Sequence, residues 1–138
     1  MTAASVRKPR VLLAEDDANA RTILATILRA MDLDVVEVDD GGRMLVAVAA
    51  CYRESRPRSE IDLVVTDVRM PVVSGIEIVK NIRRAGWSAP IIIVTGWVTP
   101  ELEEAAKRYG GVLLPKPLDL NVFERTVRDL LDQRRAAG

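Results

Sequence analysis

The sequence predicts an α/β fold, a doubly wound sandwich in which helices cover both faces of a five-stranded parallel sheet. Two observations predict it. Short runs of apolar and β-branched residues recur along the chain, and most are almost continuously apolar, which is typical of strands buried on both faces. Between the runs lie segments whose apolar residues recur every three or four positions, as in helices with one buried side. With 138 residues, the chain is expected to form one domain.

The first half of the chain is predicted to contain two strands and two helices. In order, the elements are a strand at 10–14, a helix over 18–31, a strand at 34–38, a turn at 39–42 and a helix over 43–52. Asp17 or Asn19 is expected to cap the first helix. The apolar stripe of that helix is expected to comprise Ile23, Leu24, Ile27, Leu28 and Met31. The charged, proline-containing run at 53–60 indicates a solvated loop.

The second half supplies the remaining three strand–helix units. They are a strand at 63–67 with a helix from 74 to 85, a strand at 91–95 with a helix from 100 to 109, and a strand at 112–115 with a helix from 120 to 135. Ser74 with Glu77, Thr99 with Pro100, and Asp119 are helix-start signals. The buried faces of the first and last of these helices are expected to comprise Ile76, Val79 and Ile82, and Val122, Phe123, Val127, Leu130 and Leu131.

Five βα units in succession predict a flavodoxin-like sandwich with strand order 2-1-3-4-5. The expected organisation is a flexible segment at 1–8, one folded domain at 9–135 and a tail at 136–138. No segment is long enough to form a second domain.

Composition narrows the possible chemistry. The absence of histidine excludes Ser-His-Asp and Cys-His nucleophile systems, the common zinc sites and a phosphohistidine carried by this chain. Cys51 is the only cysteine and is expected to be a half-buried hydrophobe. Twenty basic and 20 acidic residues balance, so we do not expect direct nucleic-acid binding. No apolar stretch reaches membrane-spanning length and the start carries no signal segment, so we expect no membrane association and a cytoplasmic location.

Polar side chains follow four of the predicted strands. Glu15 and Asp16 come after the first strand, Asp67 ends the third, Thr95 ends the fourth and Lys116 follows the fifth. Alone, Asp67 would more simply end a strand and cap a turn. Because the carboxyl ends of parallel strands share one edge of the sheet, however, we expect all five side chains to converge there.

Such a cluster favours a cation and a phosphoryl group. Neighbouring carboxylates repel one another unless a cation is bound, and an all-oxygen ligand set favours Mg²⁺. The expected ligands are Glu15, Asp16, Asp67 and the backbone carbonyl of Arg69. Phosphoryl oxygens would find the metal, the Lys116 ammonium and the Thr95 hydroxyl, with Asp67 as the nucleophile that forms an acyl phosphate.

Along essentially its whole length, the sequence resembles the receiver domains of response regulators. The matching pieces are Glu15-Asp16, Asp67 within Thr66-Asp67-Val68-Arg69-Met70-Pro71, Ser74-Gly75, Thr95-Gly96 and Lys116-Pro117. Each piece is a weak signal alone, but all of them in order are specific.

The resemblance implies a role for each matched residue. Asp67 would accept a phosphoryl group from a histidine kinase or a histidine phosphotransfer protein. Asp16 would bind Mg²⁺ directly and Glu15 through a water. Lys116 would pair with Asp67 in the inactive state and later bond a phosphoryl oxygen, while Thr95 would swing toward the phosphoryl group. A cis peptide between Lys116 and Pro117 is also implied.

The chain departs from the family pattern in two places. Leu113 stands where receivers commonly carry a Tyr or Phe, so an aromatic switch there is impossible. Trp97 is either a substitute reporter or a partly buried loop aromatic. The stretch between Gly42 and Asp67 is longer than usual, which we interpret as a lengthened second helix and loop.

Three hypotheses for the function remain. The favoured one is a phosphorylation-controlled binding module without an output domain, whose helices at 100–109 and 120–135 contact an unknown target or form a homodimer. The alternative is a docking module that binds a partner without phosphorylation. The third, an aspartyl-phosphate phosphohydrolase, lacks an evident cap or second acid. We therefore expect no enzyme activity beyond self-phosphorylation and slow autodephosphorylation.

Overall fold

Five parallel strands form the centre of the molecule in the computed structural model, which describes residues 8–44, 46–47, 61–68, 74–84 and 86–137. The strands are β1 (Arg10–Ala14), β2 (Asp34–Val38), β3 (Leu63–Asp67), β4 (Ile91–Thr95) and β5 (Gly111–Pro115). Their spatial order, β2-β1-β3-β4-β5, confirms the predicted topology. The order reverses direction between β1 and β3, which is where ligands bind in doubly wound sheets.

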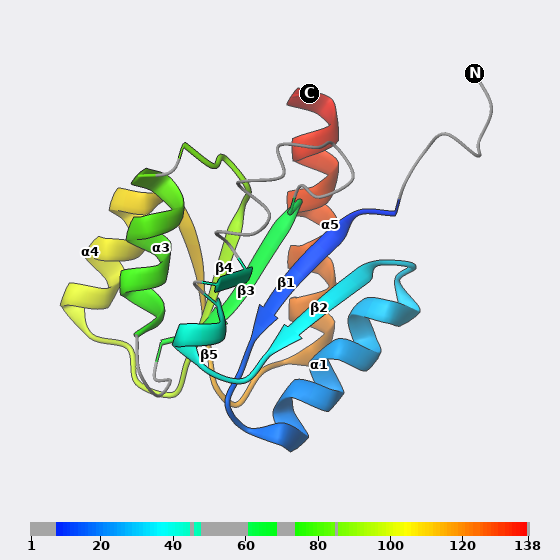
Figure 1. Ribbon diagram of the computed structural model, residues 1–138, viewed down its shortest axis with the longest axis horizontal. Coiled ribbons are helices and arrows are strands. Elements are labelled where there is room, and N and C mark those ends of the chain that lie inside the picture. The colour runs from blue at the N-terminus through cyan, green and yellow to red at the C-terminus, as the bar shows by residue number, and fades with distance from the viewer. Residues whose placement is uncertain (1–7, 45, 48–60, 69–73, 85, 138) are drawn as a thin grey trace.

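Helices cover both faces of the sheet (Figure 1). They are α1 (Ala18–Ala30), α3 (Gly75–Arg84), α4 (Pro100–Tyr109) and α5 (Leu120–Ala137). Side chains of α1 and α5 share one hydrophobic cluster, and those of α3 and α4 share the other. The fold is therefore the predicted three-layer sandwich.

The predicted second helix begins earlier than expected. Positions 41–44 and 46–47 are helical, so the turn predicted at 39–42 is wrong from residue 41 onward. The side chain of Asp40 accepts a hydrogen bond from the backbone N–H of Arg43 at 2.7 Å and so caps this helix. The rest of the predicted helix, Cys51 and the charged loop lie outside the described residues, as does the segment at 1–7.

Alternation along the strands divides the core into two halves. Val11, Leu13 and Val65 pack toward α1 and α5, whereas Leu12 and Val64 pack toward α3 and α4. Successive side chains of a strand point to opposite faces, so a strand with helices on both sides needs an almost unbroken apolar run. The apolar runs in the sequence meet this requirement.

Capping groups fix where the helices begin. Asp17, rather than Asn19, caps α1 by accepting a hydrogen bond from Ala20 N at 2.8 Å. Thr99 caps α4 with Pro100 in its first turn, and Asp119 caps α5. The hydroxyl of Ser74 accepts from the backbone N–H of Glu77, so the serine half of the predicted capping box is present. A polar side chain therefore caps the N-terminal end of each of α1, α3, α4 and α5.

Two side chains predicted to face the core do not. Ile23 in α1 is 50% exposed and Val122 in α5 is 36% exposed. Both lie at the border of an apolar stripe, where periodicity cannot distinguish a core contact from a surface one. In α3, Ile78 is fully buried although it was not among the predicted inner residues, and Ile76 is only half-buried.

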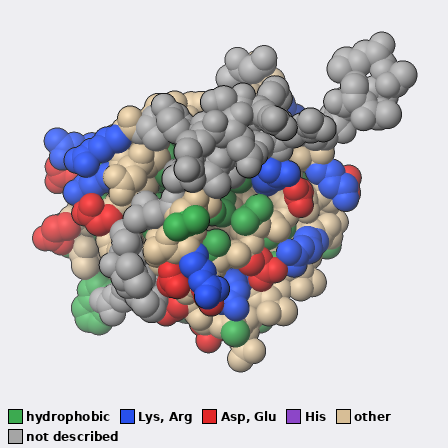
Figure 2. Space-filling model, in the orientation of Figure 1, with side chains coloured by type: hydrophobic (Ala, Val, Ile, Leu, Met, Phe, Trp, Pro, Cys, Tyr) green, Lys and Arg blue, Asp and Glu red, His purple; other side chains and the backbone are tan. Residues whose placement is uncertain are grey.

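The surface carries charges of both signs. On the face shown in Figure 2, basic and acidic side chains are intermingled rather than separated into fields. None of the helices in the described part of the chain is long and apolar enough to span a membrane.

The fold predicts a sharp contrast between two adjacent residues of α5. Phe123 is fully buried, so Phe123→Ala should lower the free energy of unfolding by about 3–5 kcal/mol through lost burial and a residual cavity. Val122→Ala, the matched control on the same helix, should lower it by about 1 kcal/mol or less because its side chain already meets solvent. Urea unfolding measures both. Equal losses would contradict the assignment of the buried face.

Candidate functional site

Four strands deliver their polar residues to the same edge of the sheet. Asp67 pairs in register with Val94, and Thr95 with Pro115, so the carboxyl ends of β3, β4 and β5 lie level. Glu15 follows β1, and its N–H donates to the carbonyl of Val38 on β2. The predicted convergence of the strand ends is therefore observed, and among the predicted side chains it brings together Glu15, Asp16, Asp67 and Lys116.

The acidic residues form one compact group. Glu15, Asp16 and Asp67 each place a carboxylate oxygen within 4.8 Å of the others. Glu15 and Asp67 are 2% and 7% exposed, whereas Asp16 faces solvent. Burial of two carboxylates without a nearby cation would be costly. The expected fourth ligand, the carbonyl of Arg69, lies outside the described residues.

Lys116 supplies a cation to this group. Its ammonium lies 2.6 Å from Asp67 Oδ2 and donates as well to Glu15 Oε1 and Oε2, at 3.2 and 3.4 Å. The expected pairing of Lys116 with Asp67 is thus present. Burial lowers the pKa of Lys116, but the hydrogen bonds and charges of Asp67 and Glu15 together outweigh it and raise the pKa above its ordinary value. The ammonium therefore stays charged.

The donor set fits a divalent cation. When all three carboxylates are ionised, they and the one ammonium leave two negative charges uncompensated, and all the candidate ligand atoms are oxygens. Hard oxygen ligands with one exposed member are suited to Mg²⁺, which retains several of its waters. The residues Glu15, Asp16 and Asp67 would hold it.

The hydroxyl of Thr95 is engaged by the backbone of Trp97. This hydroxyl accepts a hydrogen bond from the N–H of Trp97 and donates to the carbonyl of the same residue, both at 3.0 Å. The residue is 2% exposed. A movement of Thr95 toward Asp67 would therefore break both contacts with Trp97.

A family model for the response regulator receiver domain matches residues 11–128. The chain belongs to the response regulator receiver family. Among curated proteins, it is 33% identical over 110 residues to the response regulator receiver protein Anae109_2439 of Anaeromyxobacter sp. (strain Fw109-5). It is 32% identical over 129 residues to the transcriptional regulatory protein ZraR of Salmonella typhimurium.

These matches cover 79% and 93% of this receiver but only 43% and 27% of the two relatives, so the chain spans less than half the length of either. Among solved structures, a CheY-like response regulator receiver domain protein from Methanospirillum hungatei JF-1 is similar with a TM-score of 0.84. That comparison covers 96% of this chain and all of the other at 20% identity, which establishes the shared fold.

The receiver motif Ser74-Gly75 has a steric reason that the sequence did not reveal. The N–H of Gly75 donates to the carbonyl of Val68 at 3.0 Å, and a Cβ at this position would collide with the carbonyl oxygen of Asp67. Only glycine allows the first turn of α3 to approach the end of β3 so closely. The start of this helix therefore lies directly against the backbone of Asp67.

Leu113, at the position of the usual switch aromatic, and Trp97, its candidate substitute as a reporter, both lie within the described residues. Leu113 is half-buried on β5 and packs against the cluster beneath α3 and α4. Trp97 is 66% exposed, so of its two interpretations that of a partly buried loop aromatic is wrong, and its role as a reporter stays a prediction. The Lys116–Pro117 peptide is cis, as the resemblance implied.

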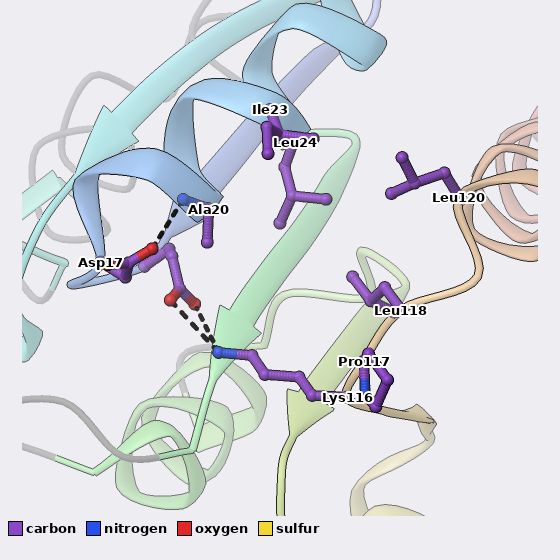
Figure 3. A pocket seen from close by; sticks show the side chains of 9 residues that line it. Asp17, Ala20, Ile23, Leu24, Lys116, Pro117, Leu118 and Leu120 are labelled. Carbon is purple, nitrogen blue, oxygen red and sulfur yellow. Dashed lines mark hydrogen bonds and ion pairs between the residues drawn. The ribbon is translucent and has the colours of Figure 1, made fainter.

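An apolar pocket beside Lys116 was not found by sequence reasoning. It has a volume of about 450 Å³ and lies between α1 and the segment that leads from β5 into α5 (Figure 3). Its apolar lining includes Ile23 and Leu24 on one side and Leu118 and Leu120 on the other. The exposed Ile23 lines this pocket. Its position at the border of the apolar stripe of α1 was the sequence feature that could have indicated an apolar surface here.

Glu15 holds a proton unusually strongly. Burial, followed by the hydrogen bond and charge of Asp67, raises the pKa of Glu15 from 4.5 to about 7, although Lys116 opposes the shift. Near neutral pH the metal-free site is therefore partly protonated, and a bound cation would compete with that proton.

This shift predicts how the stability of the metal-free protein depends on pH. The folded state binds the Glu15 proton more tightly than the unfolded chain, so the stabilisation is fully present below about pH 4.5 and is lost as the pH rises through about 7. Between about pH 5 and about pH 8, deprotonation of Glu15 should lower the free energy of unfolding by on the order of 1–3 kcal/mol. Urea unfolding in a chelator measures it. An equally steep fall in Glu15→Gln would contradict this origin.

Proposed function

We propose that this receiver accepts a phosphoryl group on Asp67 from a phosphohistidine of a partner protein. One observation carries the proposal. Asp67 ends β3 with its carboxylate bound to Lys116 and beside two further acids, at the reversal point of the sheet. A nucleophile, a cation and a metal-compatible group of oxygens therefore occupy the position where doubly wound folds bind ligands.

The chemistry is a direct transfer. A carboxylate oxygen of Asp67 attacks phosphorus, the new O–P bond forms as the N–P bond breaks, and the electron pair returns to the imidazole nitrogen of the donor. These 138 residues contain no histidine, so the donor belongs to a histidine kinase or a histidine phosphotransfer protein. When bound by the three acids, Mg²⁺ would neutralise charge on the phosphoryl oxygens. Lys116 would move its hydrogen bond from Asp67 to one of those oxygens.

The apolar pocket suits the approach of such a donor. It shares Glu15 and Lys116 with the phosphoacceptor site and exposes Ile23 and Leu120 at its rim. We assign it to an apolar surface of the histidine-bearing partner, because burial there would bring the donor beside the site.

Phosphorylation would be communicated through Thr95. A hydrogen bond from its hydroxyl to the phosphoryl group would release the backbone of Trp97 at the start of the segment that leads into α4. We propose that a target protein, or a second copy of the chain, binds the altered face of α4 and α5. We propose that the protein acts in the cytoplasm. We also propose that it does not hydrolyse small phosphoesters as an enzyme.

Phosphoryl uptake by Asp67 is the central test. Incubation with Mg²⁺ and acetyl phosphate should add the mass of one phosphoryl group to the wild type and none to Asp67→Asn, because an amide is not a nucleophile of this kind. Intact-protein mass spectrometry measures the gain. Asp119→Asn is the matched control, since Asn also caps helices and the residue lies at the start of α5. A wild type that gains no mass would instead support the docking module.

Lys116 should couple phosphorylation to the movement at Trp97. In Trp87→Phe, Trp97 is the remaining tryptophan. Phosphorylation of this variant should shift the fluorescence emission of Trp97, because the backbone contacts of Trp97 with Thr95 are exchanged for solvent. Lys116→Ala should still bind Mg²⁺ through the three acids but lose most of that shift. Mass spectrometry must verify equal phosphorylation before the spectra are compared. A full shift in phosphorylated Lys116→Ala would refute the coupling.

A further inference from the structure

Arg21 binds the acidic loop, which comprises Glu15, Asp16 and Asp17 between β1 and α1. Its Nη1 donates a hydrogen bond to the backbone carbonyl of Glu15 at 2.8 Å, from the second turn of α1. The Arg21 side chain is 21% exposed and is therefore mostly buried. No motif in the sequence singles out this arginine.

The guanidinium is itself anchored on β2. Its Nε lies 3.6 Å from Glu37 Oε1, and Arg29 holds the other oxygen of the same carboxylate at 3.0 Å. Glu37 precedes Val38, whose carbonyl accepts the N–H of Glu15. Both peptide groups of Glu15 are therefore held from outside the acidic loop, one by the backbone of β2 and the other by Arg21.

The second of these peptide groups determines where Asp16 points. The carbonyl of Glu15 and the N–H of Asp16 belong to one rigid plane, so fixing the carbonyl removes a rotation that would otherwise swing the Asp16 carboxylate. Asp16 is the exposed member of the acidic group, so burial restrains its side chain less than it restrains that of Glu15. Its orientation therefore depends on the backbone.

The contact acts through geometry more than through charge. Apart from burial, the groups that shift the pKa of Glu15 are Asp67 and Lys116, and Arg21 is not among them. A single partly exposed ion pair such as the one with Glu37 contributes little to stability. What remains specific to Arg21 is its hold on the Glu15 carbonyl.

We propose that Arg21 is a positioning residue that orients the Glu15–Asp16 pair for a divalent cation. The proposal rests on the metal site of the proposed function. Partners that orient metal ligands from outside typically change metal affinity by about 10–100-fold when they are removed. Arg21 therefore sets the Mg²⁺ concentration at which this receiver becomes competent for phosphorylation.

Calorimetric titration of the full chain with Mg²⁺ tests this. Arg21→Met keeps the aliphatic stem and removes the donors, and it should raise the Mg²⁺ dissociation constant about tenfold or more. Arg29→Met is the matched control, because it lies on the same helix and binds the same Glu37 without contacting Glu15. It should bind Mg²⁺ like the wild type. Circular dichroism verifies the fold of both variants.

A second readout separates positioning from a general loss of structure. At saturating Mg²⁺, Arg21→Met should take up phosphoryl groups from acetyl phosphate at the wild-type rate, since only metal affinity is impaired. Wild-type affinity in Arg21→Met, equal weakening in both variants, or a rate that excess Mg²⁺ does not restore would each overturn the inference while leaving the proposed function intact. A wild type that binds no Mg²⁺ would overturn the inference and the metal site together.

Discussion

The ion pair between Lys116 and Asp67 is the contact on which the rest of the site depends. It joins residues that are 49 positions apart in the sequence. It lies at the edge of the sheet where the carboxyl ends of β3, β4 and β5 are aligned. Glu15 shares the same ammonium from 101 positions away. Two buried acids tolerate each other here because the ammonium of Lys116 bonds both of them, whereas the third acid, Asp16, adds a further negative charge at the surface. The site is thus strained electrostatically in a way that a divalent ion would relieve.

The sheet explains why such distant residues can meet at all. Its central strands β1, β3 and β4 are buried on both faces and almost continuously apolar, so the polar side chains that follow them gather where these strands end. Parallel pairing then brings these ends to one edge. The same rule made the five βα units and the convergence of Glu15, Asp67 and Lys116 predictable from sequence, because both follow from where apolar runs stop.

Details that depend on three-dimensional neighbours were not predictable. The exposure of Ile23 depends on how far Leu118 and Leu120 lie across the pocket from α1, and helical periodicity does not encode that separation. Asp40 caps a helix whose first residues, Gly41 and Gly42, are typical of a turn and led to the wrong prediction of one. The role of Arg21 depends on a backbone carbonyl, and every residue except proline offers the same backbone groups. Such contacts leave no pattern in a single sequence.

Gly75 adds a mechanical asymmetry to the site. Because no methyl group fits between the first turn of α3 and the carbonyl of Asp67, this side behaves as a fixed wall. At the end of β4, Thr95 holds Trp97 by two hydrogen bonds that can be exchanged for others. A rearrangement around Asp67 would therefore meet more resistance from the start of α3 than from this threonine, which would give the domain one preferred direction in which to yield.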